Sequence, residues 1–123
     1  MAKILIIDDD IDTTNLLESM VKTKGHQPVS VNNSMSAVEA ANSTNPDLIL
    51  LDIMMPGING IQLCKMFQSI PELKHIPVII VSALNDIGSK KDAFNAGAKE
   101  FITKPLRPGE LTQKIKSLLG ETK

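Results

Sequence analysis

The chain has 123 residues, of which 42% are hydrophobic and 22% charged, with 13 Lys and Arg against 14 Asp and Glu. This composition is ordinary for one globular domain that is large enough to bury a core. The near-neutral charge and the absence of Trp and Tyr argue against a nucleic-acid partner. Cys64 is the single cysteine, which excludes an internal disulfide, and no apolar run approaches the ~20 residues of a membrane span. We therefore expect one cytoplasmic domain over 1–123, with an ordered core over about 3–119 and no membrane partner.

Five short apolar segments alternate with helical patterns along the chain. The predicted strands are Lys3–Asp8, Gln27–Val31, Asp47–Asp52, Pro77–Ser82 and Lys99–Thr103. The first, third and fourth are rich in Ile, Val and Leu, which is typical of inner strands that are covered on both faces. The second and fifth strands are more polar, which favours the two edges of a sheet.

Helical spacing of apolar residues predicts the elements between and after the strands. The predicted helices lie at 11–24, 34–44, 59–69, 87–96 and 108–119. The fourth has few apolar residues and is expected to be only lightly anchored. Strict alternation of strands and helices indicates a parallel sheet with right-handed crossovers and helices on both faces. We predict an α/β fold with a five-stranded parallel sheet of order 2-1-3-4-5, which is flavodoxin-like.

Chemically active side chains follow four of the five predicted strands, whereas the second strand contributes none. In chain order they are Asp8, Asp9, Asp10, Asp52, Ser82 and Lys104. The carboxyl ends of parallel strands meet at one edge of the sheet, and ligands collect there beside the point where the strand order reverses. The sequence therefore predicts a site between the first and third strands.

Three of these carboxylates, on Asp8, Asp9 and Asp52, need a compensating partner. Two carboxylates ~4 Å apart repel each other by about 4 kcal/mol at an effective dielectric constant near 20. Either one of them takes up a proton or a divalent cation binds among them. An all-oxygen ligand set favours Mg²⁺, with Mn²⁺ as the second choice. With Lys104 as a fixed cation and Ser82 as a hydroxyl donor, the cluster suits a phosphoryl group, and Asp52 suits its nucleophile.

In these residues the chain resembles the CheY-like receiver domains of two-component response regulators. The resemblance covers the whole chain. It rests on the acidic group at Asp8–Asp10, Pro46-Asp47-Leu48 leading to Asp52, Met55-Pro56-Gly57 with Gly60, Pro77-Val78-Ile79 leading to Ser82-Ala83, Gly97-Ala98, and Lys104-Pro105. Each piece alone is a weak motif, but all of them in order and on the expected elements form a specific one.

The resemblance implies an acceptor and a metal site. Asp52 matches the residue that receives a phosphoryl group. Asp8 and Asp9 match the acidic pair, with Asp9 and Asp52 as direct Mg²⁺ ligands and Asp8 acting through water. The backbone carbonyl of Met54 matches the third protein ligand.

The resemblance also implies a switch. Ser82 matches the switch hydroxyl, Lys104 the phosphate-pairing lysine, and Phe101 the aromatic ring that turns inward on activation. The bond between Lys104 and Pro105 is expected to be cis, as X–Pro bonds tolerate that form. The apolar residues Met54 and Leu84 beside the acceptor indicate a longer-lived phosphoryl-aspartate.

By this resemblance the chain would be a stand-alone response regulator, a signalling phosphoprotein that catalyses only its own phosphorylation and dephosphorylation. Its phosphodonor would be a histidine kinase or a histidine phosphotransfer protein. A downstream effector protein would bind the surface around the fourth helix, fifth strand and fifth helix. The chain would act as a monomer or a phosphorylation-dependent dimer, unless it is a segment of a longer regulator.

Three alternatives are open to the same residues. Asp8-x-Asp10 after a strand is also found in haloacid-dehalogenase-like phosphohydrolases, but that family needs Thr or Val where Asp12 stands and leaves Asp52 unexplained. An EF-hand loop that starts at Asp8 would lack the Gly at its sixth position and the Glu at its twelfth. A receiver-shaped scaffold without phosphorylation would not need all three carboxylates and Lys104. For Asp10 or Asp12, capping of the first helix is a simpler explanation than chemistry.

Overall fold

A computed structural model describes residues 2–120, apart from the side chain of Pro108. One parallel sheet has the strand order β2-β1-β3-β4-β5. Its strands are β1 (Lys3–Ile7), β2 (Gln27–Val31), β3 (Leu48–Leu51), β4 (Val78–Ser82) and β5 (Glu100–Thr103). This order confirms the predicted fold class, and β2 and β5 form the two edges as predicted.

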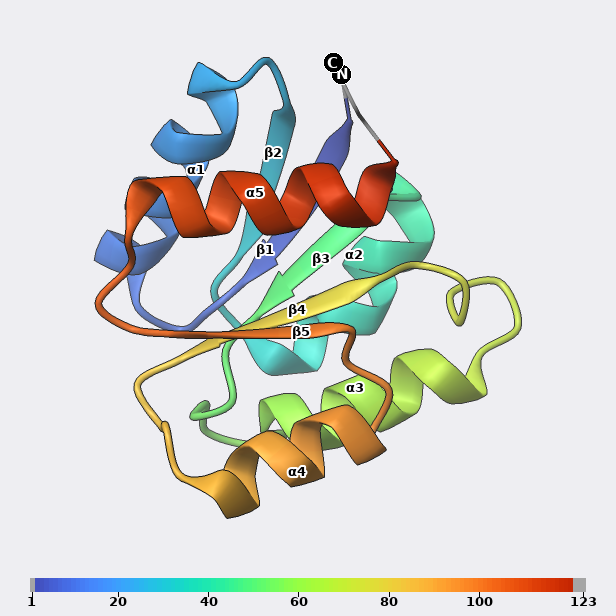
Figure 1. Ribbon diagram of the computed structural model, residues 1–123. Coiled ribbons are helices and arrows are strands. Elements are labelled where there is room, and N and C mark those ends of the chain that lie inside the picture. Colours follow the sequence, from blue (N-terminus) through green and yellow to red (C-terminus); the bar gives the residue numbers. More distant parts are fainter. Residues whose placement is uncertain (1, 121–123) are drawn as a thin grey trace.

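Helices cover both faces of the sheet (Figure 1). One face packs against α1 (Ile11–Thr23) and α5 (Pro108–Leu119). The other packs against α2 (Ala37–Thr44), α3 (Gly60–Ser69) and α4 (Ile87–Asn95). A short 3-10 turn, η1 (Ser34–Ser36), precedes α2, so the helix predicted over 34–44 has a tighter first turn.

The inner strands divide their side chains between two cores. Every residue of β3 and β4 is buried. Successive residues of a strand point to opposite faces, so Leu48 and Leu50 join the core under α1 and α5. Ile49 and Leu51 join the core under α2, α3 and α4. Continuous apolar runs therefore place these strands in the middle of the molecule and bring their polar ends to its edge.

The start of α3 lies directly against the end of β3. Asn59 caps this helix, because its side chain accepts the Gln62 N–H at 2.9 Å while the Gln62 side chain accepts the Asn59 N–H at 2.9 Å. The backbone N–H of Gly60 donates to the Ile53 carbonyl at 2.8 Å. A Cβ atom on Gly60 would lie 2.0 Å from the Asp52 carbonyl oxygen, so only glycine fits this approach. The contact fixes the loop that follows Asp52.

Helix α4 is the most weakly packed helix in the described part of the chain, as predicted. Ala93 is its one fully buried residue, whereas Ile87 is 85% exposed and Phe94 47% exposed. Its first turn is held by Asp86, whose side chain accepts the Ser89 N–H at 2.9 Å. Within residues 2–120 no helix has the length and apolar character needed to cross a membrane.

Candidate functional site

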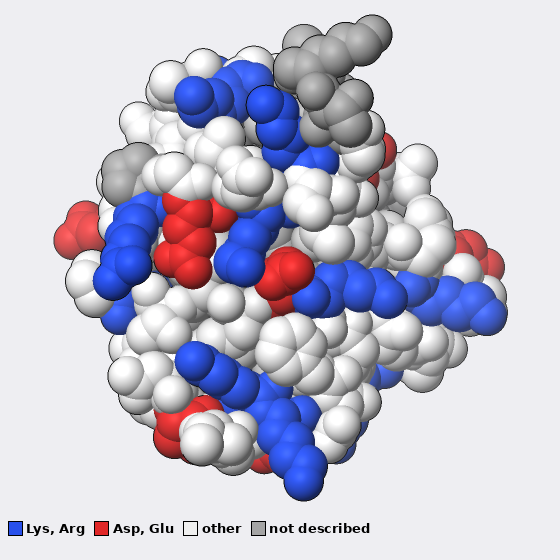
Figure 2. Space-filling view, viewed as in Figure 1, with Lys and Arg blue, Asp and Glu red and all other residues white. Residues whose placement is uncertain are grey.

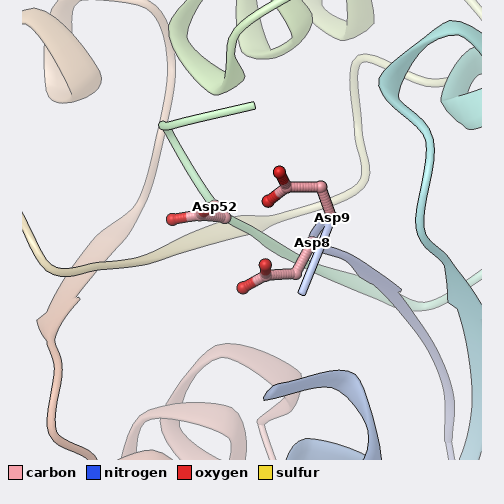
Figure 3. Close-up of side chains that lie close together, drawn as sticks. All are labelled: Asp8, Asp9 and Asp52. Atoms are coloured by element: carbon pink, nitrogen blue, oxygen red, sulfur yellow. The ribbon is translucent and has the colours of Figure 1, made fainter. Parts of the chain in front are cut away.

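Three carboxylates converge where β1 and β3 end side by side (Figure 3). Asp8, Asp9 and Asp52 each offer an oxygen, and these atoms lie within 4.8 Å of one another. The Asp52 N–H donates to the Ile7 carbonyl at 3.0 Å, which extends the pairing of β1 and β3 up to the cluster. Asp8 and Asp52 are buried, while Asp9 is exposed. The cluster is therefore an acidic recess with one side open to solvent.

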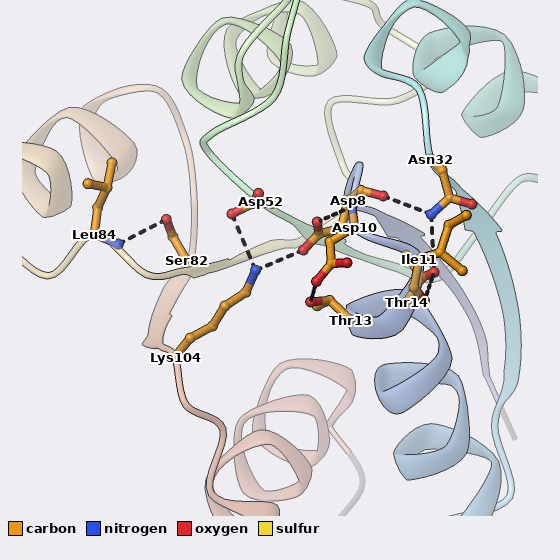
Figure 4. A network of polar contacts seen from close by, with 10 residues as sticks. All are labelled: Asp8, Asp10, Ile11, Thr13, Thr14, Asn32, Asp52, Ser82, Leu84 and Lys104. Atoms are coloured by element: carbon orange, nitrogen blue, oxygen red, sulfur yellow. Dashed lines mark hydrogen bonds and ion pairs between the residues drawn. The ribbon is translucent and has the colours of Figure 1, made fainter.

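Lys104 supplies the positive charge of the site. Its Nζ lies 2.9 Å from an Asp8 carboxylate oxygen and 3.7 Å from an Asp52 oxygen. Its backbone N–H donates to the Ser82 carbonyl at 2.8 Å, which ties the end of β5 to the end of β4. The Lys104–Pro105 peptide bond is cis. Figure 4 shows the lysine reaching across from β5 to both carboxylates.

Asp52 has an unusual protonation equilibrium. Burial of the carboxylate and the charge of Asp8 raise the pKa of Asp52 to about 6, against an opposing effect of Lys104. At neutral pH the group is mostly ionised, but its charge is disfavoured. A carboxylate in this state gains from any cation or electrophile that relieves it.

Of the two predicted switch residues, Ser82 is the last residue of β4 and Phe101 lies within β5. Ser82 is fully buried, and its hydroxyl oxygen accepts the Leu84 N–H at 3.2 Å. Phe101 is half-buried and packs against the core under α4. The ammonium of Lys90, on α4, lies 5.8 Å from the centre of the Phe101 ring, within cation–π range. The ring is therefore held between the core and a helix that is itself weakly packed.

Met54 follows the acceptor on the solvent side. Its side chain is 60% exposed. It lines an open hollow of about 420 Å³ together with Ile53, Met55, Pro56 and Asn59. This hollow lies along the loop between β3 and α3, which begins directly after Asp52.

Sequence reasoning missed a contribution from β2, which was expected to contribute no residue to the site. Asn32 follows this strand, and its Nδ2 donates to the Asp8 carbonyl at 2.9 Å and to the Thr14 hydroxyl at 3.1 Å. The signal was available, because Asn32 is a polar residue at the carboxyl end of a parallel strand. Asp10 does occupy the N-cap position of α1, and its side chain accepts the Thr13 hydroxyl at 2.6 Å.

The donor set fits Mg²⁺. It consists of carboxylate oxygens with no nitrogen or sulfur ligand among the clustered side chains of the described chain. After burial, the charge of Asp8 is the next cause of the raised pKa of Asp52, and a divalent cation would relieve this repulsion. Asp9 is exposed, which leaves room for the waters that Mg²⁺ keeps.

Comparison with known proteins agrees with this geometry. Residues 4–116 match the family model of the response regulator receiver domain. The chain is 35% identical over 120 residues to protein PilH of Pseudomonas aeruginosa. This alignment covers 98% of the chain and 99% of PilH. The chain is 33% identical over 117 residues to the response regulator PleD of Caulobacter vibrioides, and there it spans 26% of the relative's length. The crystal structure of a two-component response regulator from Clostridium difficile superposes with a TM-score of 0.91, at 30% identity and with 98% of each chain covered.

The fold and the site thus define a CheY-like domain. This chain belongs to the response regulator receiver family. Members of the family are signalling proteins of two-component systems, which histidine kinases phosphorylate and which act on downstream effectors. They bind Mg²⁺ at an acidic pocket. The family match decides against the phosphohydrolase and EF-hand alternatives.

Proposed function

We propose that the chain is a phosphorylation-controlled switch in two-component signalling, with Asp52 as the phosphoacceptor. The observation that carries this proposal is the convergence of Asp52 with Asp8, Asp9 and Lys104 from three different strands. A scaffold that acts by binding alone would have no use for a buried carboxylate whose charge is disfavoured. A phosphoacceptor needs a carboxylate that is ionised, accessible and close to a cation.

In the proposed reaction a carboxylate oxygen of Asp52 attacks the phosphorus of a phosphohistidine. The oxygen–phosphorus bond forms as the nitrogen–phosphorus bond breaks, and the leaving imidazole takes a proton from solvent. The Lys104 ammonium, 3.7 Å from an Asp52 oxygen, stands where it can pair with the phosphoryl oxygens. The donor is a histidine kinase or a histidine phosphotransfer protein.

Asp8, Asp9, Asp52 and the backbone carbonyl of Met54 are proposed to hold Mg²⁺, with Mn²⁺ as a substitute. When bound, the ion neutralises charge on the phosphoryl oxygens. Asp8 is already engaged by Lys104 and by the Asp10 N–H, whereas Asp9 is exposed. This difference supports Asp9 and Asp52 as the direct ligands and Asp8 as a ligand through water.

The switch is proposed to start at Ser82. Its hydroxyl would leave the Leu84 N–H and donate to a phosphoryl oxygen, which draws the loop after β4 toward Asp52. Phe101 would then turn inward, away from Lys90. Because α4 is weakly packed, a small change beneath it can shift its position.

The output surface is proposed to be the face formed by α4, β5 and α5. Figure 2 looks onto this face and shows Lys and Arg interspersed with Asp and Glu. Lys114 and Glu100 form an ion pair across it at 2.9 Å. A mixed surface of this kind suits an effector protein or a second copy of the chain, so we propose a monomer or a phosphorylation-dependent dimer. The match over 99% of the length of PilH supports the proposal of a stand-alone regulator, for which we propose a cytoplasmic location.

Intact-protein mass after incubation with acetyl phosphate and Mg²⁺ tests the proposal. The wild type is expected to gain one phosphoryl group, and Asp52→Asn is expected to gain none. Asp10→Asn is a matched control, because Asp10 neighbours the acidic pair but contacts Thr13. Gain of the phosphoryl group by Asp52→Asn, or gain by the wild type in excess EDTA, would contradict the proposed acceptor or its metal.

A further inference from the structure

Asn32 joins three segments that meet behind the acidic cluster. It is exposed and follows β2, yet both hydrogens of its side-chain amide are used within the protein. One is donated to the Asp8 carbonyl at 2.9 Å and the other to the Thr14 hydroxyl at 3.1 Å. Figure 4 shows Asn32 bridging the end of β1 and the first turn of α1.

The buried hydroxyl of Thr14 holds the Asn32 amide in place. Thr14 is 2% exposed, and its hydroxyl donates to the Ile11 carbonyl at 3.0 Å while accepting from Asn32. The hydroxyl thus has both a donor and an acceptor partner, which fixes its orientation. Asn32 is therefore oriented by a buried group and not by solvent.

The carbonyl that Asn32 holds belongs to the peptide between Asp8 and Asp9. The plane of this peptide sets the direction in which the two side chains leave the backbone. The Asp8 carboxylate is held separately, since one oxygen accepts the Asp10 N–H at 2.9 Å and the other accepts from Lys104 at 2.9 Å. The exposed Asp9 carboxylate has no such contacts among those that the structure records, so its placement relies on the peptide plane.

We propose that Asn32 is a positioning residue for the metal site. By fixing the peptide between Asp8 and Asp9, the pair of Asn32 and Thr14 orients the Asp9 carboxylate toward Asp8 and Asp52 and raises the affinity of the cluster for Mg²⁺. Outer partners that orient metal ligands act in this way in other sites. The inference rests on the proposed function, because it takes the acidic cluster to be a Mg²⁺ site.

Calorimetric titration of the unphosphorylated protein with MgCl₂ measures this role directly. Asn32→Ala is expected to weaken Mg²⁺ binding about three- to tenfold, the loss that one or two hydrogen bonds of ordinary strength would produce. Asn33→Ala is the matched control, because Asn33 is the next residue, is exposed, and has a side chain that accepts the Met35 N–H of η1 at 2.8 Å. It is expected to bind Mg²⁺ as the wild type does.

Thr14 provides a second, conservative pair of variants. Thr14→Ser keeps the hydroxyl and is expected to retain the affinity, whereas Thr14→Val removes it at nearly constant volume and is expected to reproduce part of the Asn32→Ala loss. If the two residues act as one unit, the double variant Asn32→Ala/Thr14→Val is expected to lose less than the product of the single losses.

The rate of phosphorylation by acetyl phosphate, followed against Mg²⁺ concentration, separates positioning from general damage. For Asn32→Ala the half-saturating Mg²⁺ concentration is expected to rise about three- to tenfold, while the rate at saturating Mg²⁺ stays near that of the wild type. Equal Mg²⁺ affinity in Asn32→Ala and Asn33→Ala would overturn the inference and leave the proposed function intact. A wild type that binds no Mg²⁺ and gains no phosphoryl group would overturn both.

Discussion

Asp52 is less stable as an anion inside the folded protein than in water. Burial and the neighbouring charge of Asp8 raise the pKa of Asp52 from 3.8 to about 6. A difference of this size corresponds to as much as about 3 kcal/mol of lost folding free energy at neutral pH. The carboxylate that we propose as the phosphoacceptor therefore makes the metal-free protein less stable.

Asp52→Asn is expected to stabilise the metal-free protein at pH 7.5 by about 1–3 kcal/mol, because the amide removes a disfavoured charge. The sign follows from the proton balance. Between the unfolded pKa of 3.8 and the folded pKa of about 6 the folded wild type binds more protons, so its stability falls as the pH rises through this window. The stability difference between variant and wild type is expected to be near zero below pH 4 and complete above about pH 6. Urea denaturation in EDTA, followed by circular dichroism, measures it.

The control for this experiment is Asp10→Asn, which changes an acidic residue whose side chain is fully exposed. For Asp10→Asn, the difference in unfolding free energy from the wild type should not show the same rise with pH. If the difference in unfolding free energy between Asp52→Asn and the wild type stayed constant from pH 4 to pH 7.5, the pKa of Asp52 would not be raised in the folded protein.

Lys104 and Ser82 are expected to affect the response more than the phosphorylation itself. Lys104→Ala removes the ammonium that lies 3.7 Å from Asp52 and that we propose pairs with the phosphoryl oxygens. Ser82→Ala removes the hydroxyl that we propose donates to one of those oxygens. Both variants should still gain the phosphoryl group. The shifts of α4 and β5 amide signals in heteronuclear NMR spectra on phosphorylation are expected to fall by more than half. Lys114→Ala, which breaks an ion pair outside the site, is the control. A full response in Lys104→Ala would contradict the role of this lysine.

At the scale of elements, α3 and α4 differ in how firmly they are held. Helix α3 buries Gly60, Leu63, Cys64 and Phe67 and carries a complete capping box. Helix α4 buries Ala93 and leaves Ile87 and Phe94 largely exposed. Less buried apolar area means a smaller free energy of local opening.

Amide hydrogen exchange is expected to be at least tenfold faster in α4 than in α3 in the unphosphorylated protein, a ratio that corresponds to about 1.4 kcal/mol of opening free energy. Exchange in α4 should slow on phosphorylation, when Phe101 packs beneath it. Mass spectrometry of peptic fragments resolves the two helices. Equal exchange in α3 and α4 would contradict α4 as the movable element.

The elements could be predicted well because their signals are local. Runs such as Leu48–Leu51 indicate a buried strand without reference to any other part of the chain, and the alternation of elements then restricts the topology. The acidic site was also predictable, because each of its residues follows a strand. The position of Asn32 at the end of β2 was also visible in the sequence, but its contacts were not, because the register of β1 and β2 is what places Asp8 and Thr14 within reach of its amide. The same holds for the cation–π contact of Lys90 with Phe101.

In the molecule as a whole, a single sheet contributes side chains to two hydrophobic cores, one on each face. Ile49 and Leu50 are neighbours in sequence, but the first packs under α2, α3 and α4 and the second under α1 and α5. Both are fully buried or nearly so. Neither core can lose its packing without disturbing the strand that they share.

Ile49→Ala and Leu50→Ala are each expected to lower the free energy of unfolding by about 2–5 kcal/mol, because each leaves a cavity in a closely packed core. Both should retain a single unfolding transition in urea, since the sheet couples the two faces. Ser43→Ala, on the exposed side of α2, is the control and should change stability by less than about 0.5 kcal/mol. A two-step transition in either core variant would show that the faces unfold independently.

The ion pair between Asp8 and Lys104 joins residues 96 positions apart in the chain. During synthesis the ribosome completes β1, β2 and β3, with all three site carboxylates, long before it adds the lysine. A growing chain that ends before β5 carries the acceptor without its counter-charge and without the strand that closes the edge of the sheet. A nascent chain would therefore complete the proposed site only once β5 and Lys104 have been added.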